Sequence, residues 1–503
     1  APDLWPAADG TLTPAREGCD VGDGPALAGG RWVVGVTDPV QPRHAPVPRN
    51  AGERLVFAQL YETLVNVGCD GEARPGLAST WACTEDSTTW VFTLRPDARF
   101  WDGTPVTAPR VRDAWLHNAG GDDDPSPASP WRWISARANS ISAVDARRLA
   151  IRLPEPHARF PQLLAHPAAA VALRQPGWTW PVGSGPARLR ASDPAPRPDL
   201  GCRPNLNHPD APTWDELVFH VRPGLDPRDL VGDGIDLLEL RDRENVAFFD
   251  QVPAWAVHPL PWDRQYVLVC PPDMRDDGPD PWAAAVAGLV PARDVTAVSA
   301  RDWPHVDFPR GGAVCPQLSG PIPAPDAAPL ASDLGRGRLG PRTIAYPAGD
   351  AAAAELAGRL GHLAGTSVRI AGLAAVDYDL ALEWQMSGAF VLPLDQLFPT
   401  GCLQLATLMG RAAWLQKAGL DRPEARAGDS LAAADRDAAW RAPDPAAVLA
   451  AAGVVHPLAV TRSWLAARGE IAGLRLDFDG TPLLAGLGRP DPAPHPTAAG
   501  ATP

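Results

Sequence analysis

A helix pattern enclosed by strand patterns constrains the fold of this chain more than any other feature. Residues 352–365 form the helix pattern, which Asp350 can cap and Gly365 can end. Three leucines fall on one face of this helix: Leu356, Leu360 and Leu363. Strand patterns flank the helix at 343–348 and 367–373, and a third follows at 378–384. Strands joined through a helix run parallel, so the second half of the chain is predicted to hold an α/β lobe.

Strand patterns dominate the first half of the chain. Alternating apolar residues, typical of half-buried strands, occur at 89–95, 148–153 and 214–222, and a short buried run occurs at 265–270. Residues 30–260 therefore predict a mixed sheet with short connections. The whole chain has 503 residues, which is long enough for two or three lobes.

The charge balance and the apolar runs exclude several classes of partner. The chain has 59 acidic and 45 basic residues, a formal net charge of −14, and such a surface repels nucleic acids and anionic membranes. No run of about 18 apolar residues is present, so no membrane-spanning helix is predicted. Residues 1–17 lack a basic region followed by an apolar one, which fits either a cytosolic protein or a secreted protein whose signal peptide was removed.

The cysteines and short motifs indicate neither a metal site nor a catalytic site. Seven widely spaced cysteines include no CxxC pair, which disfavours zinc and suits a few disulfides with one spare thiol. Residues 335–340 match GxGxxG, but a strand follows where dinucleotide binding needs a helix, so a flexible loop is predicted. Ser184 lies in VGSGP, which differs from the nucleophile pattern GxSxG. We therefore expect no enzyme activity, no metal and no cofactor.

Two loop tryptophans are candidates for ligand contact. Trp131 and Trp133 flank Arg132 and follow an acidic, proline-rich stretch. Loop aromatics beside an arginine suit a cleft that stacks a ligand and pairs with its negative charge. The alternative is a local Trp–Arg stack at the surface.

Several segments, in order along the chain, resemble the family-five extracellular solute-binding proteins, the receptors of peptide and nickel ABC transporters. Residues 61–64 (YETL) resemble the family's YE-x-L segment, and residues 75–81 (PGLASTW) resemble P-x-L-A-x-x-W. Residues 89–108 are similar to its most diagnostic stretch, W-x-F-x-L-R followed by D-G-x-P. Weaker matches follow at three places: 181–186 (PVGSGP), 232–237 (GDGIDL) and 378–384 (YDLALEW). The resemblance covers roughly residues 31–487.

The resemblance implies a fold of the α/β class, the two-lobed periplasmic-binding-protein fold (type II, cluster C-like) with an extra subdomain in lobe one. Lobe one is expected at 31–56, 172–262 and 466–487, its inserted subdomain at 57–171, and lobe two at 263–465. The chain would cross between lobes near residues 263 and 465. Residues 1–30 would form an N-terminal arm and residues 488–503 a disordered tail.

The resemblance also implies the function of an ABC-importer receptor that captures a small solute, a peptide or peptide-like by default, through hinge closure. Its partners would be that solute and a membrane permease, with no nucleic acid, and the protein would be a monomer. An extracytoplasmic location is implied, in the periplasm or lipid-anchored at the cell surface. Two alternatives stay open: a secreted binding protein that lost transport, or a receptor for a non-peptide ligand such as a metal chelate or a sugar.

The family's ligand contacts imply an aromatic-lined cleft. By this resemblance its lining residues would be Tyr61, Trp131, Trp133, Trp384 and Phe390, with Arg132 as the polar anchor. The alternative for Tyr61 and Trp384 is a purely structural place in the core. The sequence departs from the family's dipeptide receptors, because residues 346–350 lack their Arg and no acid follows Trp384 until Asp395. A buried ammonium without a counter-charge is costly, so a short zwitterionic peptide is disfavoured.

An exported protein can hold disulfides, and one is expected between Cys69 and Cys83, which flank a predicted turn. Two buried thiols are the alternative.

Overall fold

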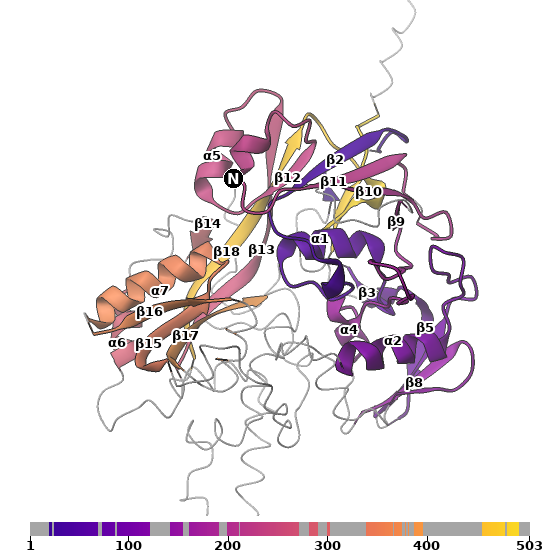
Figure 1. Cartoon of the computed structure of the whole chain (residues 1–503), viewed down its shortest axis with the longest axis horizontal. Helices are drawn as coiled ribbons and strands as arrows, with labels where there is room; N and C mark the ends of the chain where they lie inside the picture. The colour runs from indigo at the N-terminus through magenta and orange to yellow at the C-terminus, as the bar shows by residue number, and fades with distance from the viewer. Residues whose placement is uncertain are drawn as a thin grey trace, which may run out of the picture.

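One mixed sheet runs through the computed structural model and connects its two lobes (Figure 1). The eleven strands in the described part of this sheet include the path β16-β15-β17-β13-β18-β12-β2-β11-β10-β9, and β14 (Ser299–Arg301) pairs with β18. The structure describes residues 20–22, 25–68, 73–85, 88–120, 141–153, 160–190, 199–210, 212–270, 281–289, 299–301, 339–365, 367–374, 378, 381, 387–395, 455–477 and 480–491.

The first lobe is built on the half of the sheet that contains β2 (Arg31–Val36). Its neighbours are β11 (Glu216–Val221) and β12 (Leu237–Leu240), both parallel to β2. Beyond β11 the sheet continues with β10 (Asp199–Pro204), antiparallel to β11, and β9 (Ala187–Leu189), antiparallel to β10. Trp32 and Val34 face one buried cluster and Val33 faces another, as the two-residue period of a strand requires. Helix α1 (Ala51–Leu60) contributes to the first cluster and α5 (Arg243–Phe249) to the second. The predicted mixed sheet is confirmed.

The second lobe contains the predicted parallel strand–helix–strand unit. Strand β15 (Gly340–Pro347) pairs in parallel with β16 (Arg369–Leu373) and with β17 (Ser387–Asp395), and α7 (Ala351–Ala364) connects β15 to β16. The short helix α6 (Pro281–Ala287) supplies Trp282 to the same core as α7.

Local sequence signals predicted the cap and most of the buried face of helix α7, but not the exposure of its last leucine. The Asp350 side chain accepts a hydrogen bond from the Ala353 amide at 2.9 Å, which is the predicted cap. Leu356 and Leu360 are buried, whereas Leu363 is 43% exposed, because the helix end lies beyond the edge of the core. Of the strand expected at 378–384, the structure describes only Tyr378 and Ala381, and both are helical where a strand was expected.

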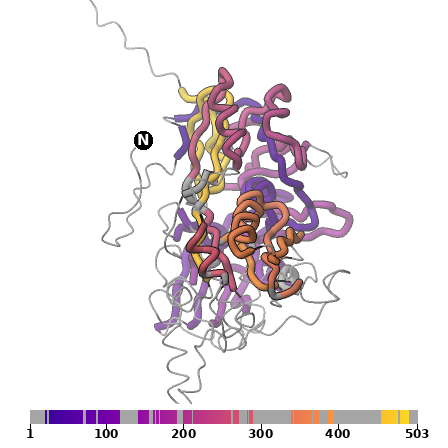
Figure 2. The backbone as a smooth tube through the Cα atoms, turned by 90° about the vertical axis from the view of Figure 1, so that its left-hand side faces the viewer, coloured from indigo at the N-terminus to yellow at the C-terminus, as the bar shows by residue number. Residues whose placement is uncertain are grey.

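Two long strands run from one lobe into the other. Strand β13 (Trp255–Val269) and strand β18 (Val455–Arg468) pair antiparallel over almost their whole length. Near one end of the pair β18 borders β12 of the first lobe, and near the other end β13 borders β17 of the second. Figure 2 shows them side by side down the molecule. The register shifts between Pro259 and Trp262, between Trp262 and Arg264, and between Tyr266 and Val267, so the pairing of the two strands is irregular over residues 259–267.

The subdomain has a sheet and a core of its own. Strands β5 (Ala78–Cys83), β6 (Thr89–Leu94), β8 (Arg148–Arg152) and β7 (Ile141–Ala143) form an antiparallel sheet in the order β5-β6-β8-β7. The remaining elements are β3 (Val65–Val67), β4 (Ala73–Pro75), α2 (Ala108–Gly120) and α4 (Phe160–Leu163). The predicted alternation in β6 is confirmed, because Trp90, Phe92 and Leu94 are all buried.

The two ends of the described chain meet against the first lobe. Strand β1 (Asp20–Val21) pairs with β19 (Leu474–Leu476), which pairs with β20 (Pro482–Leu483). The first residues of the tail expected at 488–503 lie against the first lobe, where the Arg489 guanidinium is 4.4 Å from the Trp32 ring centre and 3.1 Å from the Asp236 carboxylate. Residues 492–503 lie outside the described part of the chain. Among the described helices, none combines the length and the apolar character that crossing a membrane requires.

Candidate functional site

Three of the segments that carry the family resemblance meet where the first lobe joins the subdomain. Tyr61 follows the end of α1, and its hydroxyl donates a hydrogen bond to the Pro181 carbonyl at 3.1 Å. The Gly183 carbonyl accepts from the Trp101 amide at 2.9 Å, and the Gly185 amide donates to the last carbonyl of α1 at 2.9 Å. Segments from about residues 61, 101 and 181 therefore converge on one junction, although they are far apart in the sequence.

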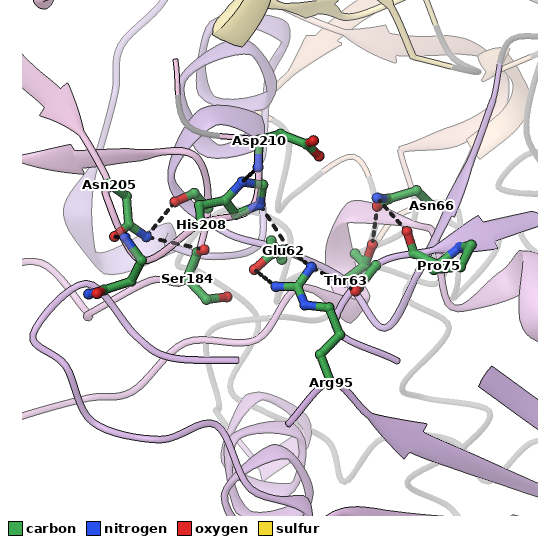
Figure 3. Close-up of polar contacts among 12 residues, drawn as sticks. Glu62, Thr63, Asn66, Pro75, Arg95, Ser184, Asn205, His208 and Asp210 are labelled. Atoms are coloured by element: carbon green, nitrogen blue, oxygen red, sulfur yellow. Dashed lines mark hydrogen bonds and ion pairs between the residues drawn. The ribbon is translucent and has the colours of Figure 1, made fainter. Parts of the chain in front are cut away.

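A buried cluster of charged and polar side chains holds this junction together (Figure 3). The Glu62 carboxylate lies 3.2 Å from Arg95 Nη1 and 3.1 Å from His208 Nε2. Glu62 lies between α1 and β3, Arg95 follows β6 of the subdomain, and His208 follows β10 of the first lobe. The side chains of Glu62 and His208 are only 8% and 7% exposed. The carboxylate therefore binds Arg95 of the subdomain and His208 of the first lobe with little competition from water.

The hydrogen bonds of His208 fix its tautomer. Its Nδ1 accepts a hydrogen bond from the Asp210 backbone amide at 3.0 Å, so Nδ1 has no proton there. Nε2 is then the nitrogen that donates to Glu62. Both ring nitrogens are occupied, which leaves neither to act as a base for the nearby Ser184. The cluster is suited to holding two bodies together and not to nucleophilic catalysis.

A second charged cluster lies on the first lobe at the end of β2. The Asp38 carboxylate accepts hydrogen bonds from Arg241 Nη2 and from the Gly52 amide, each at 2.8 Å. Arg241 also pairs with Glu239 at 3.1 Å. Burial alone would raise the pKa of Asp38, but Arg241, the Gly52 amide and the charge of Arg264 hold that pKa below its ordinary value.

A third cluster lies on the second lobe at the start of α7. The Tyr266 hydroxyl donates to both Asp350 carboxylate oxygens at 2.9 Å, and Arg264 Nη1 lies 3.7 Å from the same carboxylate. Burial and the negative charge of Asp350 raise the pKa of Tyr266 well above its ordinary value, so this hydroxyl remains a donor. From the sequence, Asp350 is predicted only as a helix cap. Its apolar strand neighbours gave no sign that Tyr266 would point at it.

The predicted ligand-contact residues fall into two groups. Tyr61 is 5% exposed within the first-lobe core, and Phe390 on β17 is fully buried with its ring centre 6.0 Å from that of Tyr378. Burial raises the pKa of the Tyr61 phenol well above its ordinary range. The other predicted contacts lie outside the described residues: Trp131, Arg132, Trp133 and Trp384. Ligand contact by any of the six stays a prediction.

The predicted disulfide between Cys69 and Cys83 is not supported. Cys83 is a free, exposed thiol at the end of β5, and Cys69 lies outside the described residues. Cys202 and Cys270 are buried. Burial, with a smaller contribution from Glu216, raises the pKa of the Cys202 thiol to about 12, so this thiol stays protonated and unreactive. Among the residues that the structure describes, no group of His, Cys, Asp and Glu side chains could hold a metal ion.

We expect the native protein to react with a thiol reagent at Cys83 and not at Cys202 or Cys270, because only the first is exposed. Alkylation before and after unfolding in urea, followed by peptide mass spectrometry, measures this difference. The Cys83→Ser variant should lose the fast-reacting peptide. A Cys83 peptide that is alkylated only after reduction would contradict the expectation and restore the disulfide.

Sequence comparison finds relatives among bacterial transport receptors. The model for the middle region of the bacterial extracellular solute-binding proteins, family 5, matches residues 72–229. The periplasmic murein peptide-binding protein MppA of Escherichia coli (strain K12) is 35% identical over 131 residues, which are 23% of this chain and 24% of MppA. The nickel-binding periplasmic protein of the same organism is 31% identical over 242 residues, which are 44% of each chain. The matched segments thus span less than half of the length of these curated relatives.

The structural likeness extends over almost the whole chain. NikA from Brucella suis, solved in complex with Fe(III)-EDTA, is similar with a TM-score of 0.66 and 16% identity, over 92% of this chain and all of NikA. At that identity the likeness concerns the fold alone. The predicted fold, two α/β lobes with a subdomain in the first, is confirmed.

Proposed function

Since the chain belongs to family 5 of the bacterial extracellular solute-binding proteins, we propose that it is the solute-binding receptor of an ABC importer. In this function it captures a small solute, a peptide or peptide-like by default, between its two lobes. Its relatives include a murein peptide-binding protein and a nickel-binding protein, which supports a transported solute of small size.

The pair of long strands carries the proposal. Strands β13 and β18 belong to both lobes, and their pairing is irregular over residues 259–267. We place the boundaries of the lobes near residues 263 and 465, where bending of these strands would let the lobes close. A solute that contacts both lobes stabilises the closed state, and its difference in affinity for the two states shifts the population.

The closed form is then the form that a membrane permease recognises. The protein would act outside the cytoplasm as a monomer, and its net charge of −14 favours no nucleic-acid partner. No bond of the solute is made or broken in this function. The occupied nitrogens of His208 support that part of the proposal, because the buried Ser184 has no base within this cluster.

A non-peptide solute, such as a metal chelate, is the second candidate. The dipeptide-receptor arginine has no counterpart in residues 346–350, and Asp350 in that segment is bonded to Tyr266. Of the two curated relatives described above, the nickel-binding protein has the longer match, and NikA was solved with Fe(III)-EDTA. These observations favour a ligand that, unlike a dipeptide, does not carry opposite charges at its two ends.

Mass spectrometry of the small molecules that co-purify with the protein tests the function and separates the candidates. Peptides, or chelates with bound metal, should be released when the purified protein is heated, and the released compound should bind again with an increase in melting temperature. A released peptide favours the first candidate and a chelate the second. The proposal fails if turnover is found for any released compound.

We expect Trp384→Ala to abolish the quenching of tryptophan fluorescence by the released compound, since the resemblance puts this ring in the cleft. Fluorescence titration of the variant measures both quenching and affinity. Trp178→Ala is the matched control, because Trp178 is 51% exposed on a first-lobe loop and its loss should leave the titration unchanged. Equal titrations for both variants would remove Trp384 from the ligand contacts.

A further inference from the structure

Two exposed arginines are neighbours on the sheet of the first lobe. Arg188 on β9 and Arg203 on β10 are directly opposite each other in the antiparallel pairing, and β9 ends the described path of this sheet (Figure 1). Directly opposed residues have Cβ atoms about 5 Å apart, and their side chains lie on the same face. Two positive charges are therefore held close together at the surface.

Both arginines point away from the core that contains α1. Their strand neighbours Ala187 and Cys202 are buried in that core. Because successive residues of a strand point to opposite faces, Arg188 and Arg203 lie on the outer face of the sheet.

On the same face, one carboxylate bridges two other arginines. Glu216 Oε2 lies 3.1 Å from Arg31 Nε, and Glu216 Oε1 lies 3.0 Å from Arg190 Nη1. The side chain of Arg190 crosses β10 at Gly201, where an added Cβ atom would lie 2.9 Å from its Cδ atom. The glycine thus lets this arginine reach the carboxylate.

A second carboxylate of this face also bridges two nitrogen groups. Asp199 Oδ1 lies 3.1 Å from Arg222 Nη1 and 2.8 Å from His220 Nδ1. On this face, a carboxylate between two nitrogen groups is therefore a repeated arrangement.

The pair of Arg188 and Arg203 has no such carboxylate. Among the residues that the structure describes, no carboxylate lies within ion-pair distance of either side chain. Like charges that are directly opposite destabilise a sheet, and a carboxylate between them would remove the repulsion. Two guanidinium groups also offer a carboxylate several donors in fixed positions.

We propose that Arg188 and Arg203 form a docking site for an Asp or Glu side chain of a partner protein, carried on an exposed acidic segment. The inference goes beyond the proposed function, because it needs neither a solute nor lobe closure. An anionic membrane fits less well, since its extended negative surface would be repelled by the net charge of −14. A narrow acidic segment can reach the two arginines alone.

The first test measures the repulsion in the protein without a partner. Arg188→Gln and Arg203→Gln should each raise the melting temperature by about 1 °C, and the double variant should gain no more than either. Calorimetry of the three variants measures this. Additive shifts would show that the two charges do not interact and would overturn the inference.

The second test measures binding to a defined probe. The probe is a Gly-Glu-Gly-Glu-Gly segment between two folded carrier domains, which keep it from entering a cleft between the lobes, and the matched probe has Gln in place of Glu. Fluorescence anisotropy at low salt should detect the Glu probe and not the Gln probe. Arg188→Gln and Arg203→Gln should each weaken binding about fivefold, equivalent to about 1 kcal/mol.

Arg110→Gln is the matched control, because Arg110 is exposed on α2 of the subdomain and its loss changes the net charge equally. It should leave the affinity for the Glu probe unchanged. The inference is overturned if Arg188→Gln weakens binding no more than Arg110→Gln, or if the Gln probe binds equally well. It is also overturned if vesicles of phosphatidylglycerol, and not the Glu probe, bind in a manner that depends on Arg188.

Competition with the small-molecule extract, released by heating the purified protein, distinguishes this inference from the proposed function. The extract should leave binding of the Glu probe unchanged. If the extract displaces the probe and Arg188→Gln has no effect, the probe occupies the solute site, so this inference fails and the receptor function stands. If Arg188→Gln weakens the probe but the extract never raises the melting temperature, the docking site stands without the receptor function.

Discussion

Gly183→Ala should lower the free energy of unfolding by more than about 3 kcal/mol, because the new methyl group has no space. A Cβ atom at position 183 would lie 2.0 Å from the Leu60 carbonyl oxygen and 2.8 Å from the Tyr61 ring. The first of these atoms is backbone at the end of α1, so it cannot rotate away. Urea unfolding followed by circular dichroism measures the loss, and hydrogen exchange at the Trp101 amide, which donates to Gly183, localises it.

Gly232→Ala is the control for this substitution. A Cβ atom there would meet no other atom within 4 Å, and its φ lies outside the left-handed region. Alanine at such a position should be neutral or slightly stabilising, because it restricts the unfolded chain. Equal stability of the two variants would show that the loop 181–186 can shift away from α1. The close packing at the junction would then contribute nothing to the free energy of unfolding.

The sequence predicted the elements whose signals are local. Helix α7 has its cap, its buried leucines and its terminal glycine within about fifteen residues, so the prediction failed only for Leu363 at its end. The strand β6 was predicted for the same reason, since alternation is visible in six residues. By contrast, 378–384 alternates as a strand does, yet Tyr378 is helical. There the packing of the hydroxyl against β17, where it donates to Val391 at 2.8 Å, outweighs local propensity.

The length of β13 could not be predicted from its own residues. Only 265–270 has a buried-strand pattern, whereas the strand begins at Trp255 and passes two prolines. Its first part is stabilised by pairing with β18, about 200 residues further along the chain. The crossover near residues 263 and 465 was predicted from the resemblance and not from the residue pattern, and it stays a prediction.

The charged clusters were missed because each joins distant parts of the chain. Glu62 was quoted within a motif, but its partners Arg95 and His208 are 33 and 146 positions away. Arg264 and Asp350 are likewise 86 positions apart. Charge alone gives no distance, so only the fold could show that these residues are neighbours.

Glu62→Ala should lower the free energy of unfolding by about 3 kcal/mol or more, because it leaves a buried cation without its partner. The Arg95 side chain is only 17% exposed, and without the carboxylate its remaining acceptor is the Gly76 carbonyl at 2.9 Å. His208 Nε2 would also lose its acceptor. Glu62→Gln should cost less, since its amide oxygen can still accept from His208. Urea unfolding measures both losses.

The position of Glu62 also predicts how its loss would affect the movement of the subdomain. It links α1 of the first lobe to the subdomain, so its loss should let these two bodies move independently and raise hydrogen exchange at the Val171 amide, which donates to the Glu62 carbonyl. Glu216→Ala is the matched control, because that carboxylate pairs with Arg31 and Arg190 at a 23% exposed site within the first lobe. Such a pair contributes at most about 1 kcal/mol. If Glu62→Ala lowers the free energy of unfolding by no more than Glu216→Ala does, the cluster does not hold the subdomain on the first lobe. The subdomain would then be expected to move as a third body when the two lobes close.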